Sequence, residues 1–118
     1  MGDVVTRAPR WVALLFRGAA LYGAAALTFS AFVPPTEPAA LLPHYAFVGT
    51  ALAFQFVFWL VGGDPVRHRA FMLAGVAEKL AFGVPALLIG PTAAMPFALV
   101  DLALGAGFLA AWRATPLR

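Results

Sequence analysis

Residues 11–33 read WVALLFRGAALYGAAALTFSAFV, an apolar run that a single charged residue, Arg17, interrupts. A helix needs about 20 apolar residues to cross the hydrocarbon core of a bilayer, and this run is long enough. Pro34 and Pro35 follow it directly, and proline cannot continue a helix. The stretch therefore predicts a transmembrane helix that ends at the double proline.

Three more apolar runs follow, and together with the first they predict four transmembrane helices, at about residues 11–33, 44–61, 66–89 and 93–112. A proline-rich connection, residues 34–43, separates the first two. Between the second and third lies Gly62-Gly63-Asp64-Pro65, in which we expect Asp64 to cap the third helix and Pro65 to lie in its first turn. A transmembrane β-barrel is rejected, because at least about eight strands of about ten residues would leave almost nothing for turns.

The composition agrees with a membrane protein. Of the 118 residues, 63% are hydrophobic and 11% charged, whereas a soluble domain is about half apolar and about a quarter charged. We therefore predict a single integral membrane domain, residues 1–118, whose main partner is the lipid bilayer. The chain has no cysteine and only two histidines, far apart, so no metal site is predicted. The basic residues form no block, which points to lipid phosphates as partners and not to nucleic acid.

The arginines predict the orientation. Pairs of arginines precede the first run, separate the second from the third, and follow the fourth: Arg7 and Arg10, Arg67 and Arg69, Arg113 and Arg118. An even number of spans places all three pairs on one side, and the positive-inside rule makes that side the cytoplasm. The predicted fold is thus an all-α, four-helix transmembrane bundle in the bacterial inner membrane, with both termini in the cytoplasm (N-in/C-in).

Polar residues inside the apolar runs are the best candidates for a site. They are Arg17, Gln55, Glu78, Lys79 and Asp101. Each charge facing lipid would cost at least roughly 2.5–3.5 kcal/mol, so we expect them to form a buried polar layer that joins the helices. Lys79 with Asp101 and Arg17 with Glu78 is the suggested pairing. Glu78 and Lys79 point about 100° apart on a helix, so we expect them not to pair with each other.

This polar layer has two interpretations, and the sequence leaves both open. It can be a ligand site, a proton relay or an acid–base pair, or it can fix the packing of the helices. His44 and Tyr45, at the outer mouth of the second helix, can contact a head group, although an interfacial pair is the favoured interpretation. Aromatic residues crowd the second helix and can line a site for a flat ring such as a quinone, but packing is favoured there as well. No cofactor is otherwise indicated.

The segment from His44 to Lys79 resembles a family of small four-helix bacterial membrane proteins of unknown function. The resemblance rests on His44-Tyr45-x-Phe47, the central Gln55, Asp64-Pro65-x-Arg67 and Glu78-Lys79, and it extends to Asp101. The sequence departs from that pattern at Tyr45, where the family has proline, and it lacks the aromatic residue of the Asp-Pro loop. Arg17-Gly18 gives a more distant resemblance to DoxX-like membrane proteins, some of which are linked to quinone-coupled oxidation. Both resemblances imply architecture and not chemistry.

Three hypotheses of function follow. The first is a non-enzymatic membrane protein that binds a small lipophilic ligand, or a membrane partner, through the charged layer. The second is a DoxX-like redox or enzyme subunit acting on a quinone or lipid, with Glu78 or Asp101 as the acid–base group. The third is a small proton-coupled transporter that works as a homodimer. No pairing of nucleophile and base is recognisable from spacing, so the first hypothesis is preferred.

Overall fold

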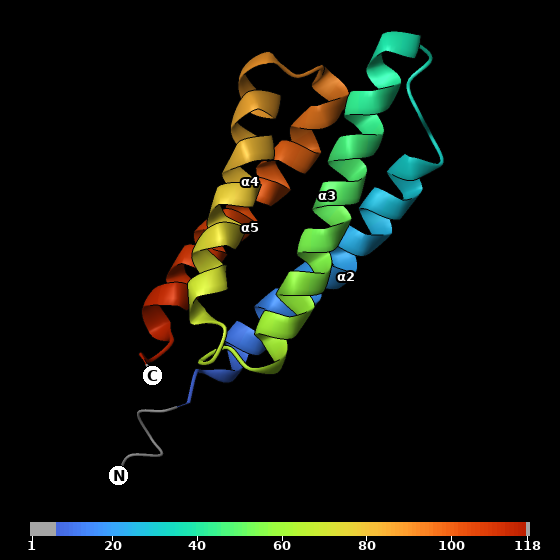
Figure 1. The fold of residues 1–118 in the computed structure, drawn as a ribbon. Coiled ribbons are helices and arrows are strands. Elements are labelled where there is room, and N and C mark those ends of the chain that lie inside the picture. The colour runs from blue at the N-terminus through green and yellow to red at the C-terminus, as the bar shows by residue number, and fades with distance from the viewer. Residues whose placement is uncertain (1–6, 118) are drawn as a thin grey trace.

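The computed structural model describes residues 7–117, and in that part the chain forms four long helices and no strand. They are α2 (Arg10–Ala31), α3 (Pro38–Gly63), α4 (Arg69–Ile89) and α5 (Met95–Ala114), with a short 3-10 turn, η1 (Thr92–Ala94), before α5 (Figure 1). The predicted all-α fold with four helices is confirmed. Each span is long and apolar enough to cross a membrane, since about 1.5 Å per residue makes the helices roughly 30–39 Å long.

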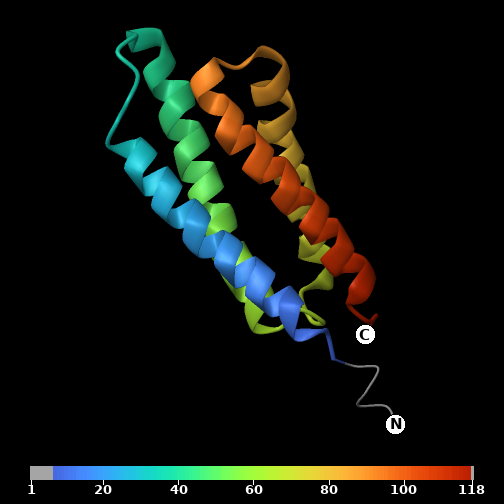
Figure 2. The same cartoon turned by 180° about the vertical axis from the view of Figure 1, so that it is seen from behind.

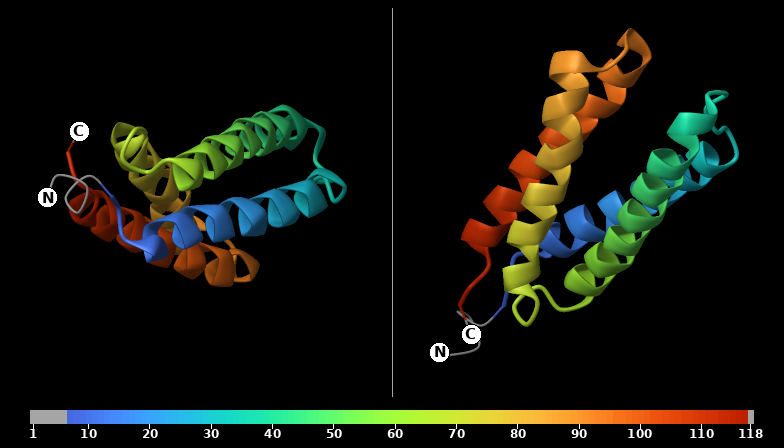
Figure 3. Two further views of the ribbon diagram at one scale, coloured as in Figure 1. Left: turned by 90° about the horizontal axis from the view of Figure 1, so that it is seen from below. Right: turned by 45° about the horizontal axis from the view of Figure 1, so that its top comes forward.

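The helices form two antiparallel hairpins, α2 with α3 and α4 with α5, and each helix packs mainly against its hairpin partner. Both ends of the described chain and the α3–α4 connection lie at one end of the bundle (Figures 1 and 2). We call this the basic end, because it carries Arg7, Arg10, Arg67, Arg69 and Arg113. The opposite end, here the far end, carries the two connections within the hairpins. The hairpins separate toward the far end (Figure 3, right).

An aromatic core joins the hairpins in the half of the bundle near the basic end. The rings of Phe16 and Phe108 stack with centroids 4.2 Å apart, and Phe58 meets Phe108 edge-on at 4.9 Å. All three side chains are fully buried. A Cβ atom on Gly75 would lie 2.9 Å from the Phe58 ring, so glycine is what lets α4 approach this core. The hairpins are therefore held together at one end and free to diverge at the other.

The outer surface of the bundle is apolar. Leu14, Phe29, Leu42 and Leu88 are each at least 70% exposed, and they come from all of the first three helices. A protein in water rarely exposes so many large apolar side chains, whereas a bilayer favours them. The surface is thus consistent with a multi-pass membrane protein.

The second helix begins earlier than the sequence predicted, at Pro38 and not near residue 44. Pro38 lies at the start of α3, where its missing N–H has no helical partner to lose. Pro43 lies inside the helix, where it removes one backbone hydrogen bond. The predicted connection of residues 34–43 is therefore wrong in its second half, because Pro38 starts the helix and the helix continues through Pro43.

The third helix begins later than predicted, at Arg69 and not at residue 66. Asp64 does not cap α4 but organises the turn before it. Its Oδ1 accepts a hydrogen bond from the Arg67 N–H at 3.3 Å, and its carbonyl accepts one from the His68 N–H at 3.1 Å. The Asp-Pro signal therefore marked a turn of residues 64–68 and not the first turn of the helix.

Candidate functional site

A pocket of about 620 Å³ opens between the two hairpins, in the half of the bundle toward the far end. α2 and α3 form one wall, and α4 and α5 form the other. Most of the lining is apolar, with Phe29, Phe47, Phe82 and Phe97 among it. The lining residues nearest the aromatic core are polar. We call these four the polar floor: Gln55, Glu78, Lys79 and Asp101.

Lys79 is the centre of the polar floor. Its side chain is only 3% exposed, and its Nζ lies 3.4 Å from Glu78 Oε1 and 3.7 Å from Asp101 Oδ1. The ammonium also lies 5.3 Å from the centre of the Phe58 ring, which belongs to the aromatic core. Gly105 makes room for it, since a Cβ atom there would lie 3.2 Å from the Lys79 Cβ. The expectation that Glu78 and Lys79 do not pair is wrong, because the flexible lysine side chain turns back toward its neighbour.

Gln55 brings α3 into the polar floor. It is 4% exposed, and its Nε2 donates a hydrogen bond to the Ala51 carbonyl at 2.8 Å. Its Oε1 has no hydrogen-bond partner and lies against Gly23 of α2, where a Cβ atom would collide with it. A buried acceptor without a partner costs about 1–3 kcal/mol. The amide is therefore held in place at the pocket with one unused acceptor.

Arg17 does not belong to this group, and its suggested pairing with Glu78 is wrong. Its Nε donates to the Trp59 carbonyl at 3.4 Å, and its guanidinium lies 4.3 Å from the centre of the Trp59 ring. Gly62 packs against the aliphatic part of the side chain, and Gly63 packs against the guanidinium. A long arginine side chain can reach away from its own depth toward the polar end of the bundle. Arg17 thus ties α2 to α3 near the basic end.

The second hairpin contains the same kind of tie. Arg69 Nε donates to the carbonyls of Trp112 and Thr115, at 3.1 and 2.9 Å, and its guanidinium lies 4.3 Å from the Trp112 ring centre. Carbonyl groups at a helix C-terminus lack partners within the helix, so a cation is well placed there. Both hairpins are therefore closed near the basic end by an arginine that stacks on a tryptophan.

His44 and Tyr45 lie outside the pocket lining. His44 Nε2 is 3.1 Å from the Ser30 carbonyl, which connects α3 to the end of α2. The two rings meet edge-on with centroids 5.2 Å apart, and Tyr45 is about half exposed. This geometry agrees with the interfacial interpretation and places neither residue at the polar floor.

Two features of the pocket were not predicted from the sequence. Tyr22 and Gly23 line it from α2, and Phe47 stacks on Phe82 across the hairpins with ring centroids 5.6 Å apart. In the sequence these residues are part of ordinary apolar runs. The one local signal in the sequence was Tyr22, a large polar-tipped residue within a stretch of small residues in the first apolar run.

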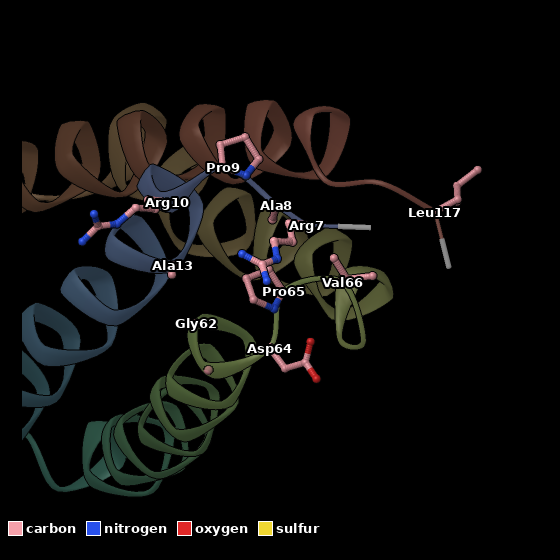
Figure 4. A pocket seen from close by; sticks show the side chains of 11 residues that line it. Arg7, Ala8, Pro9, Arg10, Ala13, Gly62, Asp64, Pro65, Val66 and Leu117 are labelled. Carbon is pink, nitrogen blue, oxygen red and sulfur yellow. The ribbon is translucent and has the colours of Figure 1, made fainter. Parts of the chain in front are cut away.

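A second pocket, of about 580 Å³, lies at the basic end, between the start of α2 and the α3–α4 connection. Arg7, Arg10 and Asp64 line it and are all exposed. Figure 4 shows Arg10 and Asp64 pointing away from each other, so their charges do not converge on one point. We assign no site there.

The pocket between the hairpins is suited to binding more than to covalent chemistry. Its walls accept an apolar group, and its polar floor offers carboxylate and amide oxygens beside one ammonium. In residues 7–117 no group of three or more histidine, aspartate or glutamate side chains is arranged to hold a metal ion. Comparisons with protein-family models, with curated proteins and with solved structures give no match. The family resemblances therefore stay predictions, and the function must be argued from the pocket.

Proposed function

We propose that the protein spans the bacterial inner membrane four times and holds a small lipophilic molecule in the pocket between its hairpins. The observation that carries this proposal is the pocket itself. At about 620 Å³ it falls within the range of about 300–1,000 Å³ that is usual for small-molecule sites, and it combines apolar walls with a few convergent polar groups. A bundle built only for packing would fill such a space with side chains.

The orientation in the membrane follows from charge. Five arginines of the described chain lie at the basic end, whereas the connection between α2 and α3 at the far end carries only Glu37 as a charged residue. The positive-inside rule then places the basic end in the cytoplasm. In this orientation the pocket lies in the outer half of the bilayer, and its polar floor lies near the middle.

The ligand binds with its apolar part between the hairpins and its polar head on the floor. Phe47 and Phe82, which stack on each other across the hairpins, form one side of the space that holds the apolar part. The head reaches Gln55, Glu78 and Asp101. At this depth in the bilayer little water is present to hydrogen-bond these side chains. Lipid chains surround the separated ends of the hairpins, so a lipophilic molecule enters from the bilayer.

Native mass spectrometry of the protein extracted in mild detergent tests this proposal. We expect the wild-type protein to carry a discrete small molecule other than ordinary phospholipid. Ala26→Phe fills the pocket from α2 and should release that molecule. Ala81→Phe is the matched control, since Ala81 lies on α4, is exposed and does not line the pocket. Retention in Ala81→Phe and loss in Ala26→Phe support the proposal.

Other results of the same experiment favour the alternatives. A bare protein in all three forms, or equal retention in both variants, contradicts the proposed site. A second copy or another membrane protein bound in place of a small molecule favours a partner-binding role. A retained quinone supports ligand binding and favours the DoxX-like redox hypothesis, and the transporter hypothesis requires proton flux that depends on Glu78.

A further inference from the structure

Counted by formal charge, the polar floor has an excess of one negative charge. Glu78 and Asp101 contribute two carboxylates, and Lys79 contributes one ammonium that lies within 3.4 and 3.7 Å of them. No other residue that lines the pocket carries a charge at neutral pH. In a medium of low dielectric constant an uncompensated charge is costly, so the site favours a positive charge from outside.

Arg17 does not supply that positive charge. Its guanidinium is held by the Trp59 carbonyl and lies against Gly63 at the end of α3. Gly63 is eight positions, or about 12 Å along the helix, from Gln55. Arg17 thus connects α2 to the end of α3 and does not compensate the negative charge of the polar floor.

The unused hydrogen-bonding atoms point to the same class of ligand. Two buried side-chain acceptors of the polar floor make no hydrogen bond in the described chain: Gln55 Oε1, and Glu78 Oε1, which has only the Lys79 ammonium at 3.4 Å beside it. The Gln55 amide cannot be turned over to offer a donor, because its nitrogen is already committed to the Ala51 carbonyl. A ligand head that donates hydrogen bonds therefore fits the acceptors of the floor.

We propose that the pocket selects ligands with an ammonium head, that is, amines carrying an apolar group of small-molecule size. This inference rests on the proposed function and names the ligand class for the same pocket. An ammonium supplies the missing positive charge and donates to the carboxylates of Glu78 and Asp101, whose side chains keep 12% and 15% exposure in the pocket. A carboxylate head would meet two carboxylates and a lysine that is already paired. Two sources carry this chemistry, a free amphiphilic amine and the head group of an aminophospholipid.

A matched series of three probes tests the inference: 4-phenylbutylamine, 4-phenylbutanol and 4-phenylbutyrate. Each is titrated at pH 7 into the protein in phosphatidylcholine nanodiscs, with empty nanodiscs as reference. We expect the amine to bind at least about tenfold more tightly than the alcohol, since hydrogen bonds between charged groups are stronger than those of a neutral hydroxyl. The carboxylate should bind more weakly than the alcohol.

Variants locate the selectivity. Asp101→Asn removes the excess charge, and it should reduce the preference for amine over alcohol to less than about threefold while the alcohol still binds. Ala26→Phe should abolish binding of all three probes, and Ala81→Phe should leave the series unchanged. The wild-type series decides the question even if Asp101→Asn does not fold. Adding phosphatidylethanolamine to the nanodiscs identifies the source: a weaker apparent affinity for the amine indicates a lipid head group, and an unchanged affinity indicates a free amine.

The two proposals fail in different ways. If none of the probes binds above the reference, the proposed ligand pocket fails. If the probes bind and Ala26→Phe prevents it, but the alcohol or the carboxylate binds as well as the amine, the pocket stands and the ammonium inference is overturned.

Discussion

Replacing Lys79 by methionine is the sharpest test of how the polar floor is held together. Methionine keeps an unbranched side chain of similar length, but it removes the ammonium that lies between Glu78 and Asp101 and 5.3 Å from the centre of the Phe58 ring. Removing one partner of a buried ion pair costs about 3–5 kcal/mol. Both carboxylates retain 12–15% exposure toward the pocket, which relieves part of this, so we expect a loss of about 2–3 kcal/mol in the free energy of unfolding.

The matched control removes all three charges together, as Lys79→Met with Glu78→Gln and Asp101→Asn. Because no uncompensated charge is left, the triple variant should unfold within about 1 kcal/mol of the wild-type protein. Unfolding is followed by circular dichroism as the fraction of sodium dodecyl sulfate in mixed micelles is raised. A Lys79→Met protein as stable as the wild type would refute the reasoning, since the carboxylates would then not depend on the lysine.

Three further predictions concern the packing around the site. Gly75→Ala should lower the free energy of unfolding by about 1–3 kcal/mol, because its Cβ would lie 2.9 Å from the Phe58 ring. The control is Gly18→Ala, which has open space around it and should change the free energy of unfolding by less than about 1 kcal/mol in the same assay. Equal losses in the two variants would contradict the packing of Gly75 on Phe58. Trp59→Leu should cost about 0.5–2 kcal/mol by removing the ring under Arg17, and double-variant analysis with Arg17→Met should show that the two effects are not additive; additive effects would count against the tie. Gln55→Leu should raise the free energy of unfolding of the ligand-free protein by about 1 kcal/mol, because it removes an unpartnered buried acceptor. The same variant should bind 4-phenylbutylamine more weakly. A loss of stability with unchanged binding would argue that Gln55 has a structural role.

The number and class of the helices could be predicted from the sequence, because in a membrane the length of an apolar run nearly determines its structure. The helix ends were less predictable. Pro43 lies inside α3 although prolines usually end helices, and Asp64 makes a turn where a cap was expected. In both cases the local signal was real, but several backbone arrangements satisfy it.

The candidate site was predicted in part. Gln55, Glu78, Lys79 and Asp101 stood out because polar residues are costly in an apolar run, and the structure brings all four to one pocket. Arg17 stood out for the same reason but reaches toward Trp59, since the direction of a long side chain cannot be read from its position on a helix. The pocket itself had no sequence signal, because it arises from the divergence of two hairpins and not from any one segment.

The central claim is that a ligand lies between the hairpins against the polar floor, and the composition of the chain allows this to be observed directly. Lys79 is the only lysine and Gln55 the only glutamine in the sequence. Labelling lysine with ¹³C at Cε only and glutamine with ¹⁵N at Nε2 only therefore gives one labelled atom at the centre of the floor and one on its α3 side, which can be followed by NMR in nanodiscs. We expect saturating 4-phenylbutylamine to shift both signals in the wild-type protein and in Ala81→Phe, and neither in Ala26→Phe. Saturable binding that leaves both signals unmoved would place the ligand elsewhere and contradict the account.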